Sequence, residues 1–214
     1  GDFVNWLEAH ARGLEVTISD PESWVLQIQG PTSLRVLEAA CDGRGPDPFP
    51  YFAVAEARLG GQDVLVSRTG WSGELGFEIY TQPGTDGPAL WDHVLEAGRE
   101  HGLEVQSLES LGIRRIEAGI LDNGTDMDPA LTPFAAGLGA FVDLGKPAFA
   151  GRDALAAADR RPLLYGISGR STPVAGTQAR LGGSVVGRVT TGAWSPFLER
   201  GIGYIRLQEP GDWL

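Results

Sequence analysis

The stretch SRTGWSGELGFEIY, residues 67–80, contains side chains that suit recognition of a ring with adjacent N–H donors. Glu78 follows the apolar Phe77, so strand alternation places these two side chains on opposite faces of a sheet. A carboxylate only accepts hydrogen bonds and can take two neighbouring donors from one ligand. Trp71 lies in the glycine-rich turn and could form a flat wall for a ring. A solvent-facing Glu78 and a Trp71 that caps a core are the structural alternatives.

A second candidate group lies in LESLGIRRIEAG, residues 108–119. Leu111 and Arg115 are four residues apart and share one helix face, and Arg114 is turned away from it. The alternative is a surface ion pair between Arg115 and a nearby glutamate, Glu117 or Glu109. The loop that follows contains DNGTDMD, which lacks the glycine placement and the terminal glutamate of a calcium loop. We therefore predict that its three carboxylates are solvated turn residues: Asp122, Asp126 and Asp128.

Composition excludes several classes of function. The net charge of −11 disfavours nucleic acid as a partner, because such binding needs clustered Lys and Arg. No apolar run approaches the roughly 20 residues of a membrane span, and no basic stretch followed by an apolar one suggests a signal peptide. One cysteine and three scattered histidines offer no metal-ligand spacing, so we expect no metal site. The phosphate loop, dinucleotide fingerprint and serine-hydrolase elbow are also absent from the sequence. We expect a cytoplasmic, soluble protein.

Hydrophobic periodicity predicts a mixture of helices and strands in the first three quarters of the chain. The predicted helices cover residues 3–13, 31–41, 87–102 and 107–118, and the predicted strands cover residues 14–18, 23–29, 51–59, 62–68 and 75–80. After residue 160 the pattern is strand and turn only. We therefore predict an α+β protein with antiparallel sheets and packed helices, followed by an all-β, barrel-like or jelly-roll-like domain. The predicted domains are residues 1–159 and 160–214.

Four segments together resemble one enzyme family. SRTGWSGELGFEIY, IRRIEAGILDNGTDMDPALTPFAAGLGAFVDL, FAGRDAL and VTTGAWSPFLERGIGYIRL occur in the order seen in the T-protein of the glycine cleavage system. The same order is found in its relatives, which include the folate domains of dimethylglycine and sarcosine dehydrogenases and the folate-dependent demethylases. The resemblance covers most of the chain, including VLQIQGPTSLRVL near its start. No single segment is specific, but their combination is.

The resemblance implies a tetrahydrofolate site. Glu78 stands in the family's GFE element and is expected to bind the pterin ring, and Trp71 is expected to line the pocket. Arg115 matches the second arginine of the family's helix element, while Leu111 stands where the family has its first arginine. Arg68, which borders the same glycine-rich turn, completes the candidate binding residues. A sulfonium or ammonium donor would also favour an aromatic wall, for which Trp71, Tyr51 and Trp194 are candidates.

Family members are much longer than this chain, and the part that precedes it normally carries a catalytic aspartate. We find no counterpart of that aspartate, so the sequence identifies no catalytic residue. We expect the chain to be a piece of a longer enzyme, without its beginning and its last strands.

The implied activity is a tetrahydrofolate-dependent one-carbon transfer, from a small methyl or aminomethyl donor or from an aminomethyl group on a lipoyl carrier protein. IRRIE and GTDM resemble the demethylase branch, similar to dimethylsulfoniopropionate demethylase, more than the glycine-cleavage enzyme. A folate-binding or regulatory domain without transferase activity is the alternative of another class.

Overall fold

The computed structural model describes residues 3–47 and 49–211, which fold as two compact units. Unit 1 comprises Gly1–Gly70 and Glu74–Val105, and unit 2 comprises Trp71–Gly73 and Gln106–Leu214. The turn around Trp71 therefore belongs to unit 2, although the strands before and after it belong to unit 1. Composition predicts a boundary near residue 160, whereas residues 106–159 group with the C-terminal strands in this division.

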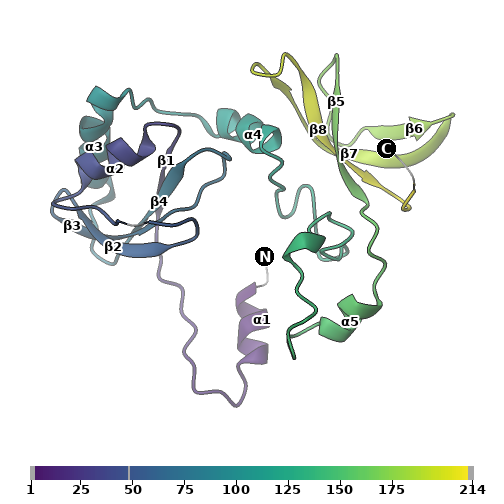
Figure 1. Cartoon of the computed structure of the whole chain (residues 1–214), viewed down its shortest axis with the longest axis horizontal. Coiled ribbons are helices and arrows are strands. Elements are labelled where there is room, and N and C mark those ends of the chain that lie inside the picture. The colour runs from purple at the N-terminus through teal and green to yellow at the C-terminus, as the bar shows by residue number, and fades with distance from the viewer. Residues whose placement is uncertain (1–2, 48, 212–214) are drawn as a thin grey trace. The chain divides into compact units, whose positions relative to one another are not determined.

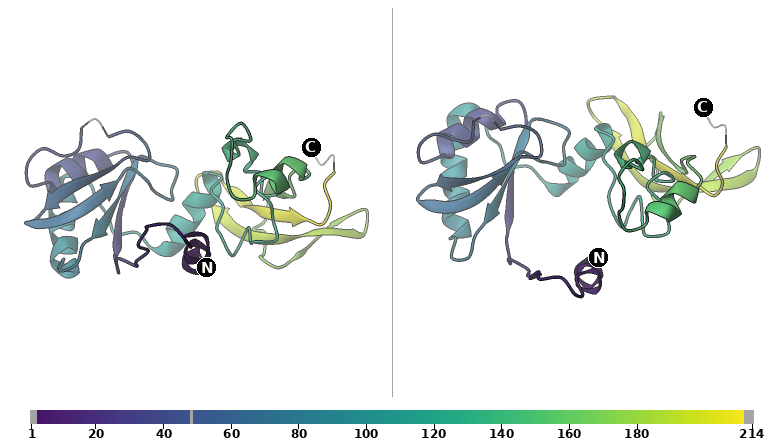
Figure 2. Two further views of the ribbon diagram at one scale, coloured as in Figure 1. Left: turned by 90° about the horizontal axis from the view of Figure 1, so that it is seen from below. Right: turned by 60° about the horizontal axis from the view of Figure 1, so that its bottom comes forward.

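Unit 1 is built on one four-stranded antiparallel sheet with the order β1-β4-β3-β2 (Figure 1). Its strands are β1 (Val25–Gln29), β2 (Val54–Leu59), β3 (Gln62–Ser67) and β4 (Gly76–Thr81), and its helices are α1 (Phe3–His10), α2 (Ser33–Ala40), α3 (Gly87–Gly98) and the 3₁₀ turn η1 (Arg99–His101). Helices α2 and α3 lie on the same face of this sheet (Figure 2). This sheet and these two helices confirm the predicted antiparallel α+β arrangement.

The core of unit 1 lies between its sheet and the two helices α2 and α3. It consists of aliphatic side chains and one ring, each almost fully buried: Ile28, Val36, Leu37, Ala40, Leu59, Val64, Val66, Phe77, Ile79, Leu90 and Val94. The β4 members alternate along the strand, as a half-buried antiparallel strand requires. The strand predicted at residues 14–18 is wrong, because this segment pairs with no other strand; Leu14 and Val16 are 64% and 56% exposed.

Unit 2 has a second four-stranded antiparallel sheet, with the order β5-β8-β7-β6. Its strands are β5 (Leu164–Gly169), β6 (Gln178–Leu181), β7 (Ser184–Ser195) and β8 (Arg200–Leu207), and its helices are α4 (Leu108–Glu117), α5 (Arg152–Ala157) and the 3₁₀ turn η2 (Gly139–Phe141). Strands β7 and β8 pair along most of their length, with an irregularity between Val189 and Thr191. A small core of Ile116, Leu164, Ile202 and Tyr204 joins α4 to this sheet.

The C-terminal sheet does not close into a barrel in the described part of the chain. Strands β5 and β6 stand at its two edges, and neither pairs with the other. A barrel requires the two edge strands to pair with each other. The predicted β-only composition after residue 160 is confirmed, and the predicted barrel is corrected to an open four-stranded sheet.

No helix among residues 3–47 and 49–211 combines the length and the apolar character that a membrane crossing requires.

Candidate functional site

Glu78 lies in the middle of β4, paired with Gln27 of β1 on one side and with Ser67 of β3 on the other. Its neighbours Phe77 and Ile79 are 1% and 0% exposed and point into the core of unit 1. Because side chains alternate along a strand, Glu78 faces away from that core and from α2 and α3. The alternation expected from the sequence is confirmed.

Three side chains hold the Glu78 carboxylate in place. Gln27 donates from Nε2 to Oε1 at 3.0 Å, and Tyr80 donates its hydroxyl to Oε2 at 3.1 Å. The Thr69 hydroxyl also donates to Oε2, and the Thr69 oxygen lies 2.7 Å from the Ser67 hydroxyl oxygen. Burial and the nearby Glu78 charge raise the pKa of Tyr80, which keeps the phenol protonated as a donor. Glu78 is thus a half-buried carboxylate with a fixed orientation.

Two glycines of the stretch leave room for one side chain, that of Gln29. A Cβ added at Gly70 would lie 2.2 Å from Gln29 Oε1, and one added at Gly76 would lie 2.3 Å from the same atom. Gln29 Nε2 donates to the backbone oxygen of Thr69 at 3.4 Å. The Gln29 amide therefore contacts Thr69, the residue whose hydroxyl donates to Glu78. These glycines are therefore required by the packing that supports the Glu78 donors.

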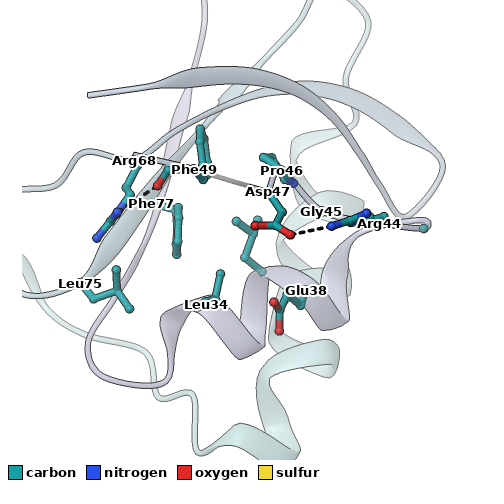
Figure 3. A pocket seen from close by; sticks show the side chains of 12 residues that line it. Leu34, Glu38, Arg44, Gly45, Pro46, Asp47, Phe49, Arg68, Leu75 and Phe77 are labelled. Atoms are coloured by element: carbon teal, nitrogen blue, oxygen red, sulfur yellow. Dashed lines mark hydrogen bonds and ion pairs between the residues drawn. The ribbon is translucent and has the colours of Figure 1, made fainter. Parts of the chain in front are cut away.

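Arg68 lies on the opposite face of this sheet from Glu78. It lines a pocket of about 470 Å³ together with Phe77, which points away from Glu78. Arg68 donates from Nη1 to the backbone oxygen of Phe49 at 2.9 Å, and the rings of Phe49 and Phe77 stack with centroids 5.7 Å apart (Figure 3). The structure therefore does not bring Arg68 to the carboxylate of Glu78.

The pocket beside Arg68 has an apolar floor and a charged rim. Leu34 and Leu37 of α2 and Leu75 complete the floor, and Glu38 and an exposed pair between Arg44 and Asp47 form part of the rim (Figure 3). Its volume falls in the range of ligand pockets. It is separate from the Glu78 carboxylate, which faces the other side of the sheet.

Unit 2 holds the other two predicted residues, Trp71 and Arg115. The guanidinium carbon of Arg115 lies 5.4 Å from the centroid of the Trp71 ring and 5.8 Å from that of Tyr204. Both distances are within the range of cation–π attraction. The structure therefore places Arg115 within reach of two aromatic rings, one from the turn around Trp71 and one from β8.

Arg115 is also the centre of a buried polar network. Its side chain is 6% exposed and pairs with Asp126, whose side chain is 0% exposed. It donates further to the backbone oxygen of Ile120 and to the Thr191 hydroxyl, both at 3.2 Å. A surface pair with Glu117 or Glu109, the alternative expected from the sequence, is wrong for Arg115; Arg114 makes the pair with Glu117.

Asp126 corrects the expectation that the loop carboxylates are solvated. It accepts hydrogen bonds from the backbone N–H of Asp122 at 2.9 Å and from the Thr190 hydroxyl at 2.8 Å, besides its pair with Arg115. Burial raises the pKa of Asp126, but these hydrogen bonds together outweigh burial and hold the pKa below its ordinary value. No periodicity marks the irregular loop, so the sequence contained no signal for this burial.

Residues 1–146 match the family model described as the GCVT N-terminal domain. An aminomethyltransferase of Clostridium botulinum (strain Okra / Type B1) is 33% identical over 214 residues, 96% of this chain and 58% of that protein. The chain belongs to the GCVT aminomethyltransferase family. The family membership expected from the sequence is therefore confirmed.

Further GCVT family members agree with this assignment. An aminomethyltransferase of Streptomyces avermitilis is 37% identical over 207 residues, covering 92% of this chain and 55% of that protein. The crystal structure of glycine cleavage system aminomethyltransferase T from Bartonella henselae matches with a TM-score of 0.84 at 28% identity, over 99% of this chain and 58% of that one. The chain thus spans less than two thirds of the length of these family members.

The remaining aromatic candidates of this GCVT chain lie at exposed positions. Tyr51 is 62% exposed and packs against the ring of Phe52, with centroids 4.2 Å apart. Trp194 is 44% exposed on β7. Leu111, which we expect to replace the family's first arginine, is half-buried on α4. Within the described residues, no group of three or more His, Cys, Asp or Glu side chains could hold a metal ion.

Proposed function

We propose that the full-length protein is a tetrahydrofolate-dependent one-carbon transferase, and that Glu78 binds the pterin ring. The observation that carries this proposal is the Glu78 carboxylate itself, which three neutral donors orient on a sheet face turned away from the core. A carboxylate at this position serves no core packing. An oriented, acceptor-only group is the chemistry that a ring with adjacent N–H donors requires.

The hydrogen-bond capacity of Glu78 fits such a ligand. A carboxylate has about four lone-pair positions, and Gln27, Thr69 and Tyr80 already occupy three of them. A ring with two adjacent donors would therefore need one present donor to move. We assign this movement to Tyr80, whose hydroxyl bonds Oε2 at 3.1 Å and stands at the side-chain end of a rotatable phenol.

Tetrahydrofolate would supply N5 as the nucleophile that accepts the one-carbon unit. The protein residues would then bind and orient: Glu78 fixes the ring through its carboxylate, and Trp71 forms one wall. Holding a nucleophile about 3–3.5 Å from an aligned carbon can supply much of the acceleration, so a rigid binding site matters more here than a covalent side chain. Arg68, on the opposite face of the sheet, is the predicted contact that this geometry supports least.

Two donors are compatible with the proposal. Family membership supports an aminomethyl group delivered by a lipoyl carrier protein. The segments IRRIE and GTDM, which resemble the demethylase branch, favour a methyl group from a sulfonium, methoxy or methylamine compound. The two donors give different products, 5,10-methylene-tetrahydrofolate and 5-methyl-tetrahydrofolate.

The decisive assay supplies the full-length protein with tetrahydrofolate and each donor in turn, and identifies the folate product. We expect one of the two products, and a severe loss of its formation in Glu78→Ala. The matched control is Glu56→Ala, because Glu56 is an exposed glutamate of the same sheet, on β2. Binding of tetrahydrofolate without either product would support the non-catalytic alternative. The absence of both binding and product would refute the proposed function.

A further inference from the structure

The geometry points to Arg115 as a positioning residue for Trp71: it holds the indole ring in place for the ligand and does not contact the ligand itself. This inference rests on the proposed function, in which Trp71 forms a wall of the folate site. It also changes the role that the family resemblance suggests for Arg115, from binding residue to support.

The first argument is that the Arg115 guanidinium is buried and already bound to partners within unit 2. Its donors are directed to Asp126, to the backbone oxygen of Ile120 and to Thr191, and its side chain is only 6% exposed. A ligand that took these donors would leave the Asp126 carboxylate buried without its cation, which is among the more costly changes in a protein interior. Arg115 is therefore unsuited to direct ligand binding.

The second argument is the position of the Trp71 turn. Trp71–Gly73 belongs to unit 2, while the chain before and after it belongs to unit 1. Arg115 contacts the Trp71 ring at 5.4 Å, and Gly73 approaches Ala118 so closely that an added Cβ would lie 2.5 Å from the Ala118 Cβ. Arg115 and Ala118 thus hold the two ends of the turn at one place, the C-terminal end of α4.

The third argument is the rigidity of the support. Asp126 fixes Arg115, and Asp126 is itself fixed by the Asp122 backbone N–H and by Thr190. Tyr204, the second ring near the guanidinium, has its pKa raised to about 12, with burial as the main cause, and it donates to the backbone oxygen of Ile120 at 3.2 Å. The Trp71 ring therefore stacks on a cation that is held from α4, the following loop, β7 and β8.

The test combines a spectroscopic signal with ligand affinity in the full-length protein. The main variant is Arg115→Met/Asp126→Asn, which neutralises both partners so that no buried charge is left unpaired. The signal of Trp71 is the difference between the near-ultraviolet circular dichroism of the wild type and that of Trp71→Phe. The matched control is Arg206→Met/Asp128→Asn, because that pair, 2.7 Å apart, joins the same loop to β8.

We expect the main variant to lose the Trp71 signal and to raise the dissociation constant of tetrahydrofolate by about 2- to 30-fold, the range of one cation–π contact. When Trp71 is already replaced by alanine, adding Arg115→Met/Asp126→Asn should change the dissociation constant of tetrahydrofolate by less than about twofold. The reason is that Arg115 is expected to act on the ligand only by positioning the Trp71 ring. The control pair should leave the Trp71 signal unchanged.

An undiminished loss of affinity in the Trp71→Ala background would overturn the inference, since it would mean that Arg115 acts on the ligand without the ring. An unchanged Trp71 signal in the main variant would also overturn it. If the wild type does not bind tetrahydrofolate, the proposed function fails, while the dichroism still decides whether Arg115 orders Trp71. Should the main variant not fold, Arg115→Lys, which keeps the charge beside Asp126, is expected to lose part of the signal.

Discussion

Glu78 and Arg115 are both charged residues of sequence motifs, yet their surroundings differ in kind. Glu78 is half-buried, its three partners are neutral donors, and it forms no ion pair within the described residues. Arg115 is buried, is paired with a buried carboxylate and lies near two aromatic rings. A buried charge that is neutralised by its partner cannot lose that partner without destabilising the fold. A charge that is only oriented by its partners stays available for a ligand.

The largest effect that would test this comparison is on stability. Arg115→Met leaves the buried Asp126 carboxylate without a cation, so we expect the free energy of unfolding to fall by about 3–5 kcal/mol. The double variant Arg115→Met/Asp126→Asn should recover most of that loss. Urea unfolding of the wild type and both variants measures these free energies of unfolding. A loss below about 1 kcal/mol in the single variant would mean that Arg115 is not a structural residue.

A smaller effect is expected at the glycine of the Trp71 turn. Gly73 has φ +73° and no room for a Cβ beside Ala118, whereas Gly102 has φ +74° and open space around it. Gly102→Ala should therefore cost about 1 kcal/mol for the left-handed backbone alone, and Gly73→Ala about 1–3 kcal/mol more. Thermal unfolding checks both. Only Gly73→Ala should also weaken folate binding, and equal effects of the two substitutions would contradict the close packing of this turn.

The titration of Asp126 should make the stability contributed by the Arg115–Asp126 pair depend on pH. Its pKa is lowered in the folded protein from the ordinary value of 3.8, so its contribution to stability is complete above that value and is lost as the pH falls through the folded pKa. The stability of the wild type relative to Arg115→Met/Asp126→Asn should therefore decrease as the pH is lowered from 6 to 2. Chemical unfolding at several pH values measures this difference, and a difference independent of pH would refute the assignment.

The smallest effects concern the donors around Glu78. Thr69→Val removes a donor that we expect to orient the Glu78 carboxylate both before and after the ligand binds, so folate affinity should fall by about 3- to 10-fold, the range of one net hydrogen bond. Tyr80→Phe removes the donor that we expect the ligand to displace, so affinity should change by less than about threefold. Calorimetric titration of both variants checks this order. A reversed order would mean that Thr69 is the donor that moves.

Much of this architecture could be predicted from the sequence because local patterns determine it. Alternation around Glu78 predicts its face correctly, and helical periodicity predicts α4 to within one residue at each end. The strand predicted at residues 14–18 fails because β-branched residues indicate a strand only where a partner strand is present. Nearness in sequence groups Arg68 with Glu78, but Arg68 follows the end of β3 and lies on the other face of the sheet.

The buried network of unit 2 could not be predicted in the same way. Asp126 lies in an irregular loop, and its partners Arg115 and Thr190 are 11 and 64 residues away along the chain. No local pattern reports such a contact, because burial of a loop carboxylate depends on the tertiary packing of α4 against β7 and β8. The composition change near residue 160 indicates only where the helices end. It does not indicate which segments pack together, and residues 106–159 group with the C-terminal strands.

The most direct test of the central claim is calorimetric titration of tetrahydrofolate into the full-length protein and into Glu78→Ala and Glu56→Ala. The account predicts that the wild type and Glu56→Ala bind alike, and that Glu78→Ala loses affinity by about 100-fold or more, since two charge-assisted hydrogen bonds are removed. All three proteins should have similar unfolding temperatures. Unimpaired binding by a folded Glu78→Ala would contradict the account.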